Sequence, residues 1–568
     1  MEQEGTSMNS QETSQCSQNT SSYHCNSKNQ IIYFAILIPT QSTSIKPFSQ
    51  TPPSIIMYTT SNDNQLIDDF VNVSMEIDVQ ETTTTTKPAL SMNVTSRHDT
   101  IGLQAEHKST EFCATVTAQS LPEDDDSARA PVDIVVVLDV SGSMQGRKLD
   151  LCKDTVELLL RELSPRDRFG LVTFGNEAQL VIPMSELTKQ YKEAAALKVR
   201  SLQTSGCTNM SGGIGMAAQE LDAVETPHEV RTIFLLTDGH ANRGISDRAG
   251  IVELTKSCLG PTSEKKEVAI HCFGYGVDHD QEMLGDIGNA TEGGSYYFVD
   301  KDSDISSAFG DALGGILSVV AQNTVVEIKS AADGVSILNV HHDKAVEQLD
   351  GSYKVSIGDF YAEETRDVLI TTTLQEESTN THDHTCPHIE VSISYLDTIH
   401  KKLVSSSPPL LGTIQRPKGD MVSKPNTHVV LQSIRIDTTK VITNAGALAE
   451  ANNLAGARSA IEAQVSTIQK ETAEIEATTN PLSLQFLSEL NSILPGLSTK
   501  NEWKAKGSKK AKMTTNSWHN QRCYAANFDN MSDEEEEEGI KTSPVPASTF
   551  QTSSKMKRAM RMKAMSKK

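Results

Sequence analysis

Five residues with oxygen-bearing side chains stand at three places in this chain. Asp139, Ser141 and Ser143 occupy alternate positions in one short stretch, Thr208 lies in a second stretch, and Asp238 lies in a third. Carboxylates and hydroxyls are ligands for hard cations such as Mg²⁺ and are poorly suited to zinc. These residue types therefore predict a site for one divalent cation, which we expect to be Mg²⁺ with Mn²⁺ as the alternative.

Each of the three places follows a predicted strand or enters a predicted helix. The run Ile134-Val-Val-Val-Leu138 before Asp139 is apolar throughout, which is typical of a strand buried on both faces of a parallel sheet. A second such run, Thr232–Leu236, stands just before Asp238. Because ligands bind at the carboxyl ends of strands in open α/β sheets, we expect the five side chains to converge on one edge.

Buried strands alternate with amphipathic helices over residues 129–322, which predicts a doubly wound, Rossmann-like α/β domain. Strands are expected at Asp133–Leu138, Arg168–Phe174, Gln179–Ile182, Arg231–Leu236, Glu267–Phe273 and Ser295–Val299. The third strand follows the second so closely that a hairpin and an antiparallel edge are implied. The last helix of the domain is expected at Asp304–Val320, where apolar residues recur at helical spacing.

Strand-like alternation of apolar residues flanks this domain on both sides. The segment 86–128 holds too few strands for a stable sheet of its own. We therefore expect these strands to form one β-sandwich with the strands of 323–415, with the α/β domain inserted between the two sets. Residues 425–496 then predict a helical hairpin, Val429–Ala451 with Leu454–Lys470, and a third helix that begins at Asn480-Pro481.

Both ends of the chain have the composition of disordered segments. Residues 1–85 are low in complexity, and residues 497–568 combine the acidic run Asp533–Glu538 with a basic end, Lys555–Lys568. The net charge of −23 argues against a nucleic-acid binder. The N-terminus shows no signal peptide, and the apolar run Ile31–Ile38 is too short for a transmembrane segment. We expect an intracellular protein of the cytoplasm. Import into the nucleus through the basic tail is an alternative.

The spacing D-x-S-x-S…T…D resembles the metal-ion-dependent adhesion site (MIDAS) of von Willebrand factor A (vWA) domains, and all five positions are present. The resemblance implies that Ser141, Ser143 and Thr208 coordinate Mg²⁺ largely directly. It implies that Asp139 and Asp238 act mainly through bound water.

The resemblance extends beyond the site to a particular group of eukaryotic proteins. Phe273-Gly-Tyr-Gly-Val-Asp278 and Ile357-Gly-Asp-Phe-Tyr-Ala-Glu363 are similar to the group that includes the plant RING-type vWA ubiquitin ligases. Those ligases carry a Cys/His zinc module before the vWA domain, whereas only Cys16, Cys25 and Cys113 precede it here. The resemblance therefore does not carry ligase activity to this chain.

Hydroxyl ligands leave the cation under-neutralised, and Mg²⁺ takes six oxygen ligands, so one position stays open for a carboxylate of a protein partner. No nucleophile elbow surrounds Ser141, and no histidine is placed as its base. We therefore predict a non-enzymatic interaction module with a scaffold role. Two alternatives are a substrate-recruiting adaptor of a ubiquitin ligase pathway, with the RING on another chain, and an extracellular adhesion protein. The five residues are also compatible with simple loop caps or with a site that binds no metal.

Overall fold

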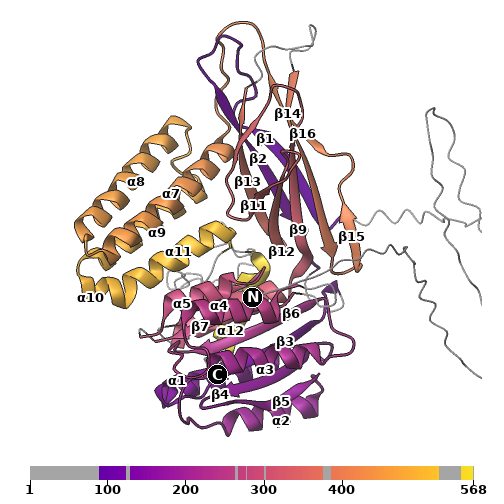
Figure 1. The fold of residues 1–568 in the computed structure, drawn as a ribbon, viewed down its shortest axis with the longest axis vertical. Helices are drawn as coiled ribbons and strands as arrows, with labels where there is room; N and C mark the ends of the chain where they lie inside the picture. The colour runs from indigo at the N-terminus through magenta and orange to yellow at the C-terminus, as the bar shows by residue number, and fades with distance from the viewer. Residues whose placement is uncertain are drawn as a thin grey trace, which may run out of the picture. The chain divides into compact units, whose positions relative to one another are not determined.

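A six-stranded sheet forms the centre of the α/β domain (Figure 1). Its strands, in spatial order, are β5 (Ala178–Glu186), β4 (Arg168–Phe174), β3 (Val132–Asp139), β6 (Val230–Thr237), β7 (Ala269–Tyr275) and β8 (Ser295–Val299). All neighbours are parallel except β4 and β5, which are antiparallel. The predicted doubly wound domain and its antiparallel edge are therefore confirmed.

The coordinates are a computed structural model that describes residues 88–122, 128–261, 267–276, 278–299, 302–374, 385–522 and 552–566. The expectation for residues 1–85 and the acidic run of the C-terminal tail lie outside these ranges. Among the described helices, none combines the length and the apolar character needed to cross a membrane.

Helices cover both faces of the sheet, which explains why residues Ile134–Leu138 of β3 are all apolar. Ile134, Val136 and Leu138 face a core shared with α1 (Arg147–Glu162), α2 (Lys189–Arg200) and α6 (Asp302–Ile316). Val135 and Val137 face the opposite core, which is shared with α3 (Met210–Asp222), α4 (Arg248–Leu259) and α5 (Gln281–Asn289). Successive side chains of a strand point to opposite faces, so a strand between two helical layers needs apolar residues throughout.

The predicted last helix of this domain extends too far. Helix α6 ends at Ile316, and Val319 already belongs to β9 (Val319–Ser330). Just beyond the end of the helix, the Ser318 hydroxyl donates to the backbone oxygens of Gly314 and Gly315 in its last turn. Val319 and Val320 continue the apolar pattern because they are buried in a strand, and burial alone does not separate helix from strand over so short a run.

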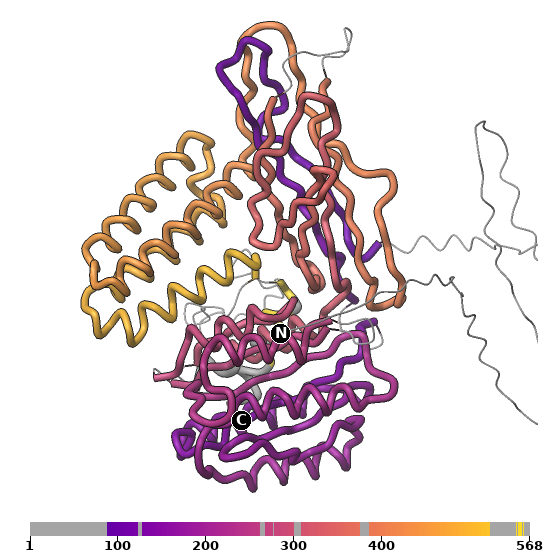
Figure 2. Tube along the Cα trace, viewed as in Figure 1, coloured from indigo at the N-terminus to yellow at the C-terminus, as the bar shows by residue number. Residues whose placement is uncertain are grey.

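Strands from both sides of the α/β domain pair in one β-sandwich. One sheet has the order β1 (Leu90–Ser96), β2 (Ser109–Ala118), β13 (Thr365–Thr373), β10 (Ile337–Val340). The other has the order β11 (Ala345–Glu347), β12 (Tyr353–Tyr361), β9, β14 (Thr385–Asp397), β15 (Lys402–Ser405), with β16 (Leu410–Gln415) also paired to β14. Figure 2 shows the indigo strands beside the later ones, where β2 pairs with β13 from Ser109↔Thr373 to Thr117↔Thr365. The α/β domain is thus inserted into the sandwich, as predicted.

A helical layer follows the sandwich and is longer than predicted. It contains α7 (Thr427–Glu450), α8 (Leu454–Glu474), α9 (Pro481–Ile493), the turn η3 (Leu494–Leu497), α10 (Lys500–Glu502), the π-helical turn η4 (Trp503–Gly507) and α11 (Ser508–Asn520). A last helix, α12 (Ser553–Ser566), packs against α6.

The prediction that all of 497–568 is disordered is wrong for 500–520 and 553–566. The side chains of Trp503 and Trp518 are buried in the core of α7, α8 and α9. Met556 of α12 is likewise buried. The lysine-rich composition around these few apolar anchors concealed helices that tertiary packing stabilises.

Candidate metal site

The loop after β3 is ordered by its own polar side chains. Asp139 is the last residue of β3, and its Oδ1 accepts a hydrogen bond from the backbone N–H of Ser141 at 2.8 Å. The next three residues, Gly142–Met144, form a single helical turn (η2), and Met144 is fully buried beneath it. The hydroxyl oxygens of Ser141 and Ser143 lie 3.1 Å apart. Burial of the methionine thus fixes the turn that places both hydroxyls beside the carboxylate.

Asp238 joins this loop because β3 and β6 are parallel neighbours. Leu138 pairs with Leu236, so the carboxyl ends of the two strands lie side by side. The Ser143 hydroxyl donates to Asp238 Oδ1 at 3.0 Å. Gly239 then turns the chain with φ of +81°, where a side-chain Cβ would meet the backbone nitrogen of Asp280 at 2.9 Å. Four of the five predicted residues therefore form one connected hydrogen-bonded group.

Thr208 lies in a loop that is fastened to the first one by backbone hydrogen bonds. The N–H of Ser205 donates to the oxygen of Val140 at 2.7 Å, and the N–H of Gly142 donates to the oxygen of Gly206 at 3.1 Å. Thr208 itself is buried, and its N–H donates to Asn242 Oδ1 at 2.9 Å. The structure thus brings the loop of Thr208 against the loop that carries Ser141.

Burial and charge make this a site of strong electrostatic interaction. Desolvation raises the pKa of Asp139 to about 6, although hydrogen bonds from Ser141 and Thr237 oppose the shift. The negative charge of Asp238 raises the same pKa further. Ser143 is exposed, so the site is accessible from solvent. A buried carboxylate beside a second carboxylate, with hydroxyls as the other groups, fits a small divalent cation.

Three further residues shape the site and were not expected from the sequence. The Thr237 hydroxyl donates to Asp139 Oδ2 at 2.6 Å and accepts from the N–H of Gly239 at 2.9 Å. The Lys148 ammonium group lies 2.8 Å from Asp238 Oδ2, where its charge would compete with a bound cation. Asn242 supports Thr208. Thr237 could have been found as the neighbour of Asp238 in the sequence, but Lys148 and Asn242 carry no such signal.

A second group of potential metal ligands lies in the β-sandwich. Donor atoms of Cys113, Asp367 and His428 lie within 4.8 Å of one another. One oxygen, Asp367 Oδ1, interacts with His428 Nε2 at 2.8 Å, with the Thr115 hydroxyl at 2.5 Å and with Cys113 Sγ at 3.4 Å. The hydrogen bond to Asp367 raises the pKa of His428. These contacts hold the start of α7 against β2 and β13. The hydrogen bonds alone explain why the side chains of Cys113, Asp367 and His428 lie together.

Comparison with known proteins identifies the central domain. The family model of the von Willebrand factor type A domain matches residues 133–311. A solved structure, the von Willebrand factor type A protein from Catenulispora acidiphila, covers 75% of this chain and 97% of its own chain, with a TM-score of 0.55 and 16% sequence identity. The chain therefore contains a vWA domain, and its resemblance to vWA proteins is confirmed.

Two curated relatives illustrate where such domains occur. The chain is 28% identical over 251 residues to the E3 ubiquitin-protein ligase WAV3 of Arabidopsis thaliana. The aligned region covers 43% of this chain and 31% of the relative. It is 27% identical over 237 residues to the inter-alpha-trypsin inhibitor heavy chain H1 of Mesocricetus auratus. That aligned region covers 40% of this chain and 24% of the relative. The matched region thus spans a third or less of either relative.

Proposed function

We propose that this protein is a non-enzymatic interaction module that binds an acidic side chain of a protein partner through a Mg²⁺ ion. Asp139, Ser141, Ser143, Thr208 and Asp238 would hold the ion. The observation that carries the proposal is the hydrogen-bonded connection of Asp139, Ser141, Ser143 and Asp238 at the carboxyl ends of β3 and β6. A bound Mg²⁺ would supply an electrophilic centre for one carboxylate oxygen of the partner.

The residues of this chain have distinct roles in the proposed interaction. Thr237 and the backbone of Ser141 orient the two oxygens of Asp139, so that the carboxylate is fixed before a partner arrives. The exposed Ser143 marks the side from which a partner approaches. Lys148 pairs with Asp238 and limits the attraction of the site for cations. Nothing in this arrangement requires a general base, and we propose no catalytic step.

The experiment is capture of partners from a lysate with the full chain as bait, in Mg²⁺ or in EDTA. We expect a set of partners that is present in Mg²⁺ and is lost both in EDTA and with Asp139→Ala. Glu462→Gln, an exposed acid on α8, is the matched control and should retain the set. Identical partner lists in all four conditions would remove the mechanism.

A second candidate function is favoured by the similarity to WAV3. We propose as this alternative that the chain recruits substrates for a ubiquitin ligase whose RING resides on another chain. A ligase among the captured partners would support it. Autoubiquitination by the purified chain would contradict the proposal that it is not an enzyme. The cytoplasm is the compartment that we propose for either function.

A further inference from the structure

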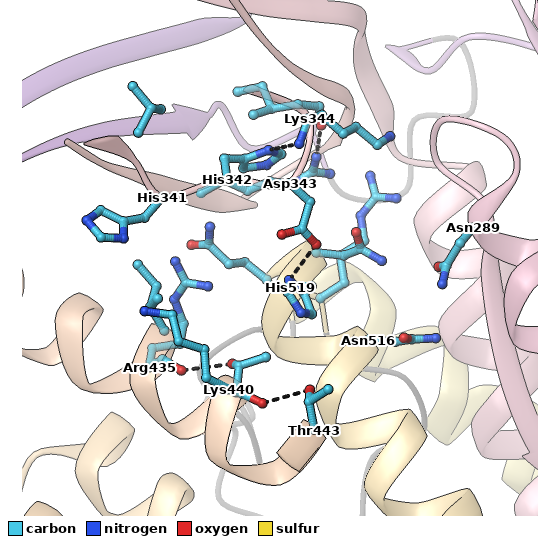
Figure 3. Close-up of a pocket in the computed structure, with 18 of the residues that line it drawn as sticks. Asn289, His341, His342, Asp343, Lys344, Arg435, Lys440, Thr443, Asn516 and His519 are labelled. Atoms are coloured by element: carbon cyan, nitrogen blue, oxygen red, sulfur yellow. Dashed lines mark hydrogen bonds and ion pairs between the residues drawn. The ribbon is translucent and has the colours of Figure 1, made fainter. Parts of the chain in front are cut away.

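A large cavity lies at the edge of the vWA sheet opposite the candidate metal site. Its volume is about 890 Å³, which is in the range that holds a ligand of drug or nucleotide size. It is lined by residues 289–294 before β8, residues 339–344 at the end of β10 and after it, Ile357 of β12, Arg366 of β13, helix α7, and residues 516–522 at the end of α11 and after it (Figure 3). The vWA domain, the sandwich and the helical layer all contribute to its wall.

The cavity wall contains a buried positive charge that makes no direct ion pair within the described part of the chain. Arg435 of α7 is 4% exposed, and it donates to Gln432 Oε1 and to the backbone oxygen of Trp518, both at 2.6 Å. Within the described part of the chain, no carboxylate lies within ion-pair distance of its guanidinium group. A buried charge is normally paired, because desolvation without a counter-charge is costly.

Two further donors on the wall lack an acceptor. Nε of Arg366 and Nδ2 of Asn516 are buried, and neither has a hydrogen-bond partner among the residues that the structure describes. Both residues are about nine-tenths buried or more. A buried N–H group without an acceptor costs about 1–3 kcal/mol, so such groups usually mark a site for a ligand or for water.

The remaining charges leave the cavity with an excess of cations. Its lining includes five cationic residues and two carboxylates: Lys344, Arg366, Arg435, Lys440 and Arg522 against Glu292 and Asp343. Glu292 pairs with Lys344 at 2.9 Å, and Asp343 pairs with His519 at 3.1 Å. Glu364, outside the lining, pairs with both Arg366 and Arg522. These carboxylates are thus occupied, and Arg435 has no direct ion-pair partner among the residues that the structure describes, although the charge of Asp367 acts on it from a distance.

We propose that this cavity binds a small organic anion with two or more phosphate or carboxylate groups. Arg435 and the free N–H groups of Arg366 and Asn516 would receive its oxygens, and Lys440 would attract it from the rim. Guanidinium groups bind phosphate and carboxylate oxygens with directed, charge-assisted hydrogen bonds. The proposal does not depend on the metal site, because the cavity lies at the amino end of β8, whereas the metal site lies at the carboxyl ends of β3 and β6.

The test is titration calorimetry of the full chain with pyrophosphate, ATP and citrate, in buffer stripped of divalent cations. We expect at least one of these anions to bind. Stronger binding of pyrophosphate and ATP would assign the site to phosphate groups, and stronger binding of citrate would assign it to carboxylates. If none of the three binds at millimolar concentration, the proposal is overturned.

Variants locate the binding within the cavity. Lys440→Glu reverses an exposed charge on α7 and should weaken binding at least tenfold without affecting folding. The matched control is Lys470→Glu on α8, an exposed lysine that also pairs with a neighbouring acid and should bind as wild type does. Arg435→Gln provides a second variant, with its fold checked by tryptophan fluorescence. Binding by both Lys440→Glu and Arg435→Gln that equals that of Lys470→Glu would overturn the proposal.

Discussion

The substitution Lys555→Met tests whether the basic C-terminal helix is an integral part of the vWA domain. The ammonium group of Lys555 lies 3.2 Å from Asp311 Oδ1 of α6, and the two side chains are 1% and 0% exposed. Tyr297 donates a hydrogen bond to the same carboxylate at 2.9 Å. Removal of one partner from a buried ion pair costs about 3–5 kcal/mol, because it leaves the other charge buried without compensation.

Because Lys555 links α12 to Asp311 of α6, the expected effect is release of α12 together with loosening of α6. Hydrogen exchange by mass spectrometry measures this directly, since local opening sets the exchange of protected amides. A loss of about 3 kcal/mol corresponds to roughly a hundredfold faster exchange in peptides of α6 and α12. The double variant Lys555→Met/Asp311→Asn should recover much of the protection, because it removes both charges.

Arg561→Met on the same helix is the matched control. Arg561 pairs with Glu162 at 3.3 Å, but its side chain is 65% exposed, so the loss should stay below about 1 kcal/mol, or roughly fivefold in exchange. The reasoning is refuted if Lys555→Met changes exchange no more than Arg561→Met does.

Three further predictions concern Lys148, Glu267 and Gly239. Lys148→Met should bind Mg²⁺ about fivefold more tightly by calorimetry, because it removes a positive charge 2.8 Å from Asp238 that is worth about 1 kcal/mol; unchanged affinity would refute the competition. Burial raises the pKa of Glu267 to about 7 from the ordinary 4.5. Between pH 4.5 and pH 7 the folded state therefore binds more protons than the unfolded state, and the folded state loses stability as the pH rises through this range. Glu267→Gln should therefore be more stable than wild type by about 2–3 kcal/mol in urea unfolding at pH 8 but equal to it at pH 4, and equal stability at both pH values would contradict this. Gly239→Ala should lower the urea midpoint, at a cost of about 1–3 kcal/mol, because alanine is strained at φ of +81° and its Cβ meets the backbone of Asp280.

The vWA domain could be predicted from the sequence because its signals are local. The run from Ile134 to Leu138 is apolar on both faces for a physical reason, namely the helical layers on either side of the sheet. Asp139 follows this run and Asp238 lies two residues after a second such run, so the topology of parallel neighbours already predicts that they are close. A single sandwich built from the strands on both sides of the α/β domain could be inferred because two strands alone do not form a stable sheet, but the pairing of β2 with β13 could not.

Features built from distant segments could not be predicted in this way. Lys148 reaches Asp238 from the first turns of α1, and its sequence neighbourhood gives no reason to expect that contact. The basic tail was expected to be free, yet Lys555 and Arg561 pair with carboxylates of the vWA domain. The cavity at Arg435 is lined by several separate segments between residues 289 and 522, and no single segment carries its signature. Tertiary contact, which propensity and periodicity do not report, determines all three.

The central claim is that five side chains hold one divalent cation and leave room for an oxygen ligand from a partner. Titration calorimetry of Mg²⁺ into the full chain and into Ser141→Ala tests it most directly, with Ser466→Ala on α8 as the control. We predict one Mg²⁺ per chain for wild type and Ser466→Ala, and no measurable binding for Ser141→Ala. No binding to wild type, or binding to Ser141→Ala that equals that of wild type, would contradict the claim.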